Sequence, residues 1–444
     1  MEIYYVKCKV SQSLHNEHQI SVEGAIAACW IKTNSPQSAR LKAEFFIEKD
    51  GWIINKFDIT YPVTREMFVG KEGLAHFDQA IKNDYSILYI AWDSKVTEET
   101  TFELNVKNKI DKSKLYEKRK KILKKECCLH FNSGDDCDHI IKAHSIQKNQ
   151  SLTSIAIDGH VYQLHCKPLL NIFYSLEGIN KVSTFKGFCK KHDDILFKPI
   201  DTSPLIPNSE QIFLYAYRSI CKELFEKSKV LELYISQLNS FTQECSESKK
   251  VQFLIEGTIL GLDQLNIIKK AYDNTIRNKT FSDIKSIVFE SPNEPIIAFS
   301  GLIYPQYDFQ GNTIQDLSNM NSNLSLLTFC SAPMKNGWGL ILAWHQENSE
   351  ASDRFITSLS QYVKEGGNLG DALFRFVISS CENHAFSPLW WNSLENSYKE
   401  RVLDRIKEML DPISIIQPTY LKFGLEGICK WDFQNFYTNL EPVS

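Results

Sequence analysis

Two stretches of this chain, CCLHFNSGDDCDHIIKAHSIQK at 127–148 and STFKGFCKKHDDILF at 183–197, concentrate its metal-binding side chains. The segment from Cys127 to His192 holds five of the twelve cysteines and six of the eleven histidines. The other cysteines are scattered singly, mostly among apolar residues, where buried and unreactive thiols are expected. We therefore expect the chemistry of the chain to lie between these two stretches.

The spacing of the residues in the two stretches indicates a single metal ion. Cys128 and Cys137 flank a turn-rich loop, which can fold back and present two thiolates to one ion. Cys189 and His192 are separated by two residues, a spacing that places both side chains on one face of a helix's first turn. The two pairs form a Cys3His set, which is typical of closed tetrahedral zinc sites. Cys127 remains an alternative to Cys128, because adjacent cysteines cannot be ranked from sequence.

The order of these residues resembles the zinc-stabilised HNH nuclease module, which has a treble-clef fold. In that family a cysteine pair precedes a strand that ends in a histidine, and a later helix opens with a second pair of ligands. The resemblance covers about 75 of the 444 residues. It implies that Cys128, Cys137, Cys189 and His192 bind structural zinc.

The same resemblance implies catalytic residues. His144 takes the position of the general base, which activates water for attack on a phosphodiester. Asp193 takes the position of a metal-binding histidine, and its carboxylate suits a catalytic Mg²⁺ or Mn²⁺. Several features depart from the family. Ala143 stands where many modules place a further metal ligand, and no orienting asparagine is identifiable, since Asn149 lies after His144. The loop between Cys128 and Cys137 and the segment before Cys189 are also longer than usual.

Structural roles for these residues are the alternative. His144 can instead be a histidine that hydrogen-bonds the cysteine loop or a nucleic-acid phosphate. Asp193 can be an acid placed in a helix's first turn by the helix dipole alone. Other potential metal ligands in the segment are His139, His160, His165 and Cys166.

The expected fold class is α+β with several domains. Residues 1–95 read as strand, strand, helix, strand, helix, strand, which resembles a ferredoxin-like sandwich with an extra strand. Residues 96–126 form a charged helical connector, and 127–205 form the treble-clef module. Residues 206–444 form a C-terminal domain of helices and antiparallel strands.

Charge and hydropathy exclude some function classes. The net charge is −4, from 50 basic and 54 acidic residues, which excludes a uniformly basic nucleic-acid binder. The basic run at 107–125 can still be a helix that contacts nucleic-acid phosphates, or only a solvated connector. No apolar stretch is long enough to span a membrane, and no secretory signal is visible. We expect a cytoplasmic protein with reduced thiols.

These features predict a metal-dependent HNH-like nuclease that cleaves DNA or RNA, with structural zinc and catalytic Mg²⁺ or Mn²⁺. As the resemblance implies, such modules in large chains often belong to bacterial anti-phage defence systems. A non-catalytic, zinc-stapled sensor or scaffold that binds nucleic acid or protein is the alternative. An enzyme site within 285–391 also stays open, and so does assembly into a homo-oligomer.

Overall fold

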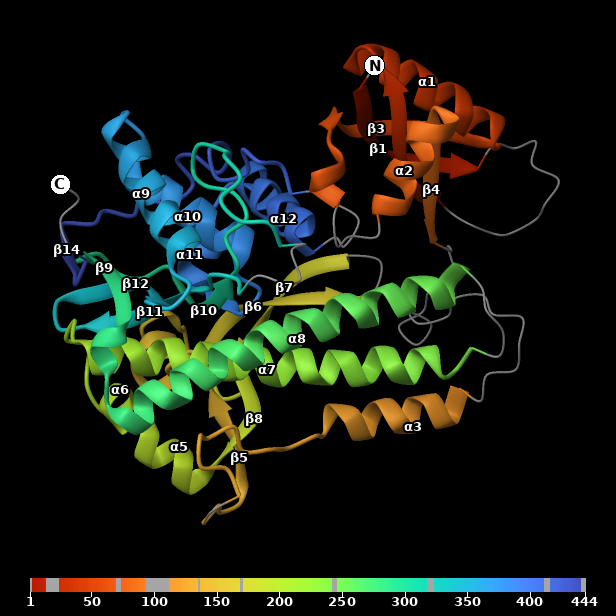
Figure 1. Ribbon diagram of the computed structural model, residues 1–444. Helices are drawn as coiled ribbons and strands as arrows, with labels where there is room; N and C mark the ends of the chain where they lie inside the picture. The colour runs from red at the N-terminus through yellow and green to blue at the C-terminus, as the bar shows by residue number, and fades with distance from the viewer. Residues whose placement is uncertain are drawn as a thin grey trace. The chain divides into compact units, whose positions relative to one another are not determined.

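The computed structural model describes residues 2–12, 24–68, 73–92, 112–134, 136–167, 171–241, 246–317, 323–410 and 416–440. These residues group into two compact units (Figure 1). The N-terminal unit consists mainly of the strands and helices before residue 93, and the second unit holds most of the rest. The chain is therefore of mixed α and β structure in more than one unit, as expected.

The N-terminal unit is an antiparallel sheet with one helix on each face. Its strands are β1 (Glu2–Gln12), β2 (Gly24–Thr33), β3 (Trp52–Val63) and β4 (Tyr85–Trp92), in the order β3-β1-β2-β4. Alternate side chains of β1 enter two separate cores. Tyr5 packs with helix α2 (Gly73–Asn83) and the short helix η1 (Arg65–Phe68), whereas Val6 packs with helix α1 (Pro36–Lys49).

This layering corrects the ferredoxin-like expectation. The strands and helices follow the expected order, but a ferredoxin-like sandwich has both helices on one face of the sheet. Here β1 is apolar on both faces, with Ile3 and Tyr5 on one and Tyr4, Val6 and Cys8 on the other. Because each apolar face must be covered, each binds its own helix.

The second unit is built on an eight-stranded sheet with the order β14-β9-β12-β11-β10-β13-β6-β7. The strands are β6 (His160–Lys167), β7 (Asn171–Gly178), β9 (Ile284–Ser291), β10 (Ile297–Ile303), β11 (Leu327–Met334), β12 (Gly337–His345), β13 (His384–Phe386) and β14 (Asn435–Thr438). Strand β13 pairs antiparallel with β6 through Phe386 and Tyr162. The segments expected to form a separate module (127–205) and a C-terminal domain (206–444) therefore share one sheet.

Helices cover both faces of this sheet. Helices α7 (Ser209–Leu238) and α8 (Ser246–Asn278) pack together, and α7 shares a core with Cys330 of β11. The next residue towards the N-terminus, Phe329, points to the opposite face and contacts Phe376 of α10 (Leu369–Ser380), which in turn contacts Phe355 of α9 (Glu350–Lys364). The alternation of β11 thus fixes which helices lie on which face.

Smaller elements complete the unit. They are α3 (Lys112–Leu123), β5 (Ile140–His144), η2 (Lys148–Leu152), α4 (Thr153–Ile155), β8 (Thr184–Cys189), α5 (Lys190–Leu196), α6 (Lys198–Asp201), η4 (Phe281–Asp283), α11 (Pro388–Ser393) and α12 (Asn396–Leu410). Helix α3 packs along α7 (Figure 1). Among the described helices, none is both long enough and apolar enough to cross a bilayer.

The turn between β11 and β12 gives a test of the sheet. Gly337 has φ +130°, and a Cβ there would lie 2.1 Å from the Ser291 carbonyl oxygen of β9. We expect Gly337→Ala to lower the free energy of unfolding by roughly 2–3 kcal/mol, because strain and overlap combine. Gly366→Ala is the control: its φ is +95°, but a Cβ there meets open space, so about 1 kcal/mol is expected. Equal losses in urea unfolding would contradict the argument.

Candidate metal centre

The centre is built on a hairpin followed by a helix. Strands β5 and β8 pair antiparallel, with Ile140 opposite Cys189 and His144 opposite Thr184. Strand β8 continues directly into α5, and Cys189 is both the last strand residue and the N-cap of that helix. Helix α5 therefore begins at the centre, and His192 lies in its first turn.

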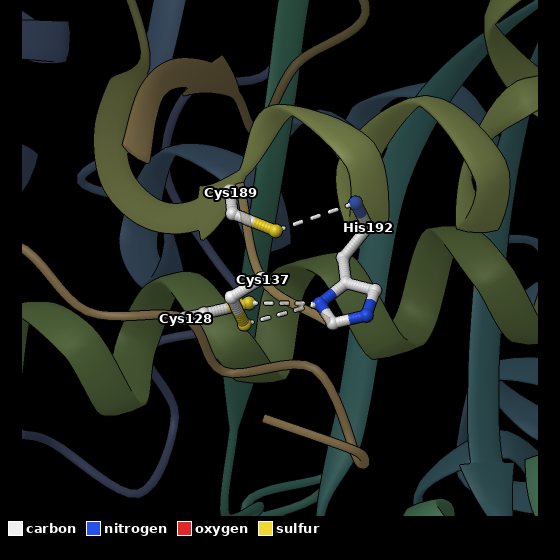
Figure 2. A group of neighbouring side chains, drawn as sticks. All are labelled: Cys128, Cys137, Cys189 and His192. Carbon is white, nitrogen blue, oxygen red and sulfur yellow. Dashed lines mark hydrogen bonds between the residues drawn. The ribbon is translucent and has the colours of Figure 1, made fainter. Parts of the chain in front are cut away.

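The structure brings all four expected ligand residues together. The ligand atoms of Cys128, Cys137, Cys189 and His192 lie within 4.8 Å of one another (Figure 2). His192 presents Nδ1 to the sulfur atoms, at 3.4 Å from Cys128 Sγ and 3.5 Å from Cys137 Sγ. Three soft sulfur donors and one imidazole nitrogen are the donor set of structural zinc, so these residues can hold such an ion.

The two adjacent cysteines have different surroundings. Cys128, and not Cys127, belongs to the metal-binding group found among the described residues. The backbone N–H of Cys127 donates to the Lys186 carbonyl at 3.1 Å, which aligns this residue with β8. The alternative ligand left open by the sequence is therefore not part of the cluster.

Backbone N–H groups surround the sulfur atoms. The His192 N–H donates to Cys189 Sγ at 3.4 Å, and the Asp138 N–H also donates to that sulfur. Although burial raises the pKa of Cys189, these bonds and the neighbouring thiols outweigh it and lower the pKa. Burial raises the pKa of Cys128 to about 11, although the backbone N–H groups of Cys189 and His130, which donate to its sulfur, act to lower it. A metal must displace this proton, so binding should weaken as the pH falls.

The loop that carries Cys128 and Cys137, residues 128–137, is held at its start by β8 and just past its end by the first residue of α5. The N–H of Leu129 donates to the Gly187 carbonyl at 2.8 Å, and the N–H of Lys190 donates to the His139 carbonyl at 2.9 Å. Gly134 and Asp136 adopt positive φ values of 98° and 57°, which reverse the chain between the two cysteines. The turn-rich loop thus folds back on itself, as expected, and brings Cys128 and Cys137 together.

The loop also contacts the long helices. The Tyr217 hydroxyl of α7 lies 3.4 Å from the Leu129 carbonyl oxygen and 2.7 Å from the Asp273 carboxylate of α8. Arg277 of α8 donates to the Phe131 carbonyl at 2.6 Å. Two carbonyl groups of the loop are therefore bonded to two different helices.

A second histidine covers the ligand ring. His130 stacks on His192 with ring centroids 3.9 Å apart and an interplanar angle of 8°. Burial lowers the pKa of His130 to about 4, so this ring is neutral at neutral pH. A neutral His130 ring adds no positive charge beside the site, so the stacking is compatible with a metal ion on His192.

The residues expected to be catalytic lie on the same hairpin and helix. His144 is half-buried at the end of β5, and its Nε2 lies 3.0 Å from the Ile179 carbonyl oxygen. Asp193 lies beside His192 on α5, and burial raises its pKa to about 6. The charges of Arg218 and Asp201 act on both side chains, so both lie near the same ion pair.

That ion pair is a feature that sequence reasoning missed. Arg218 of α7 is buried, and its guanidinium binds the Asp201 carboxylate through two bonds of 2.8 and 2.7 Å. The same group lies 4.0 Å from the centre of the Phe197 ring. A signal was present, because an arginine within the apolar run IFLYAYRSIC (212–221) must find a buried partner.

Comparison with known proteins adds no assignment. No family model matches the chain, and neither a curated protein nor a solved structure shows significant similarity to it. Function must therefore be argued from the site itself.

Elemental analysis tests the centre directly. We expect about one zinc ion per chain, from one closed four-ligand set. Cys189→Ser should lose zinc and destabilise the second unit, because this residue joins the strand, the helix and the ion. Cys166→Ser, at an exposed cysteine of β6, should retain the metal. Full zinc content in Cys189→Ser, measured by mass spectrometry of the intact folded chain, would refute the assignment.

Proposed function

We propose that the chain is a zinc-stapled, HNH-like nuclease in which His144 is the general base and Asp193 helps to hold Mg²⁺ or Mn²⁺. The observation that carries the proposal is the state of the His144 ring. Because a carbonyl oxygen only accepts, the bond to Ile179 places the proton on Nε2 and leaves a lone pair on Nδ1. Burial also lowers the pKa of His144, so the ring is neutral and able to accept a proton at neutral pH.

Asp193 supports the proposal as a potential cation ligand. Its Oδ1 atom is buried and has no hydrogen-bond partner among the described residues. A buried carboxylate oxygen without a partner is costly unless a cation or water binds it. The nearby Arg218 offsets only part of this charge: its Nη1 and Nη2 atoms bind Asp201, and although its positive charge acts to lower the pKa of Asp193, burial outweighs it. A bound divalent ion would supply charge stabilisation for the phosphodiester and its leaving oxygen.

A specific observation favours a second function, a non-catalytic zinc-stapled scaffold that binds nucleic acid or protein. Ala143, where many HNH modules place a further metal ligand, is buried in the core that α7 shares with Phe185. A longer ligand at this position would point into the core and away from His144, because successive strand residues face opposite sides. Of the described residues that match the metal-binding positions of the HNH module, Asp193 is then the one left to hold a catalytic ion, with His144 as the base, and this favours the non-catalytic function.

Cleavage assays separate the two functions. Zinc-loaded chain is incubated with plasmid DNA, single-stranded DNA and RNA in Mg²⁺ or Mn²⁺. We expect His144→Ala to lower the cleavage rate about 10²- to 10⁴-fold, the usual loss on removing a general base, with zinc content unchanged. His160→Ala is the matched control, an exposed histidine whose Nδ1 lies 2.8 Å from the Asp158 carbonyl oxygen. No cleavage by the wild-type chain would favour the scaffold, and undiminished cleavage by His144→Ala would remove this residue as the base.

Nucleic acid, the substrate of the nuclease and one of the two partners considered for the scaffold, would bind through helix α3. Lys118, Lys120, Lys121 and Lys124 are exposed, whereas Ile122 is buried and Lys125 forms an ion pair with Glu232 of α7. One side of the helix thus packs on α7 and the remaining lysines face solvent. At about 1.5 Å per residue, α3 presents a basic rod of roughly 18 Å, enough to contact several phosphates.

Charge reversal tests this surface. We expect Lys118→Glu, Lys120→Glu and Lys121→Glu together to weaken nucleic-acid binding and to reduce the salt dependence of log K by about 3, one for each phosphate that the variant no longer neutralises. Reversal of Lys335, Lys364 and Lys430, exposed elsewhere in the same unit, changes the net charge equally and should have little effect. Equal losses in both triple variants would indicate a general charge effect and contradict a surface on α3.

A further inference from the structure

The four ligand residues of the metal centre differ in their access to solvent. Cys189 is fully buried and His192 is 8% exposed. Cys128 is half-buried, and Cys137 is exposed. A small reagent in solution therefore reaches the centre through the Cys137 sulfur, while the ligands on α5 are shielded.

We propose that Cys137 and Cys128 form an oxidation site at which a peroxide converts the two ligand thiolates to a disulfide and releases the zinc ion. This inference rests on the proposed zinc site. The two sulfur atoms lie within 4.8 Å of each other, and both lie at one end of a loop that reverses at Gly134 and Asp136. Contraction of this loop can bring them into bonding distance without moving β8 or α5.

The chemistry balances with a peroxide as the oxidant. The Cys137 thiolate attacks one peroxide oxygen, the O–O bond breaks, and a sulfenic acid and a hydroxide ion form. The Cys128 thiolate then attacks that sulfur, the S–O bond breaks, and the products are a disulfide and a second hydroxide ion. Two electrons pass from the two thiolates to the peroxide. The zinc ion is left with Cys189 and His192 alone, too few ligands for a closed site.

Bound zinc would make this pair more reactive than Cys166, the other exposed thiol among the described residues. A thiol bound to zinc is deprotonated, and the thiolate is the form that attacks a peroxide. Cys166 is also exposed, but its pKa is raised by burial and by the nearby Glu382 carboxylate, so it is protonated at neutral pH. The two sites thus provide an internal comparison at similar exposure.

Oxidation at the loop reaches the long helices. The Leu129 and Phe131 carbonyls, which accept from Tyr217 of α7 and Arg277 of α8, lie in the loop that must contract. Loss of these bonds removes the contacts of Tyr217 and Arg277 with the loop, and leaves Tyr217 bonded to Asp273 of α8. We expect faster amide exchange in 213–221 and 269–277, with the N-terminal unit unchanged.

The test uses the zinc-loaded full chain and hydrogen peroxide. Zinc release is followed with a chromogenic chelator, disulfides are mapped by mass spectrometry, and amide exchange is measured before and after. We expect one zinc ion released per Cys128–Cys137 disulfide, at peroxide levels that leave Cys166 reduced, and recovery after a thiol reductant and zinc are added. Cys127→Ser should behave as wild type, since Cys127 is outside the cluster.

Two results would refute a disulfide between Cys128 and Cys137 that releases zinc. Zinc that stays bound while Cys166 is oxidised refutes it, and so does a disulfide that joins Cys127 in place of Cys128. Cys137→His offers a second check, because it keeps four donors but removes the exposed thiol, and it should hold zinc in peroxide. A chain that binds no zinc before peroxide is added refutes the zinc site itself, and the inference falls with it.

Discussion

Three sulfur atoms and one imidazole nitrogen meet within 4.8 Å, and the local structure of the chain depends on what joins them. Thiols are weak hydrogen-bonding groups, so their convergence adds little stability by itself. A zinc ion would convert the same arrangement into four strong bonds, and structural zinc contributes roughly 10–16 kcal/mol of apparent binding energy in small zinc-binding peptides. A zinc ion bound there would supply much of the energy that holds the loop at 128–137 against the start of α5.

The metal centre is connected to the rest of its unit by polar contacts as well as by packing. Tyr217 and Arg277 bind the loop, and Arg218 binds Asp201 at the end of α6. Two of these three residues lie on one turn of α7, so a single helix orients both sides of the zinc module. A disturbance at the loop therefore acts on the same helix that positions the neighbourhood of His144 and Asp193.

Sequence reasoning was most successful where the signal was local. The Cys189 and His192 spacing identified a helix start because three residues make nearly one helical turn, and the composition of the loop at 128–137 identified a reversal. The contacts of Tyr217, Arg218 and Arg277 were missed, because their partners lie from 17 to 146 residues away in the chain. Strand β13 was also missed, since three residues in an aromatic stretch give too short a pattern to read. The layering of the N-terminal unit was also missed, because the order of strands and helices alone does not say which face of the sheet each helix covers, whereas the apolar side chains on both faces of β1 require a helix on each.

The strands of the zinc hairpin are not joined by a short turn. Between the end of β5 at His144 and the start of β8 at Thr184, the chain leaves the hairpin and contributes β6 and β7 to the large sheet before it returns. Deletion of the whole segment from β5 to β8 would remove two strands from that sheet and leave the edge of β13 without a partner strand. The four-ligand centre and the large sheet therefore form one structural unit, unlike a zinc finger, which folds separately from the domain to which it is attached.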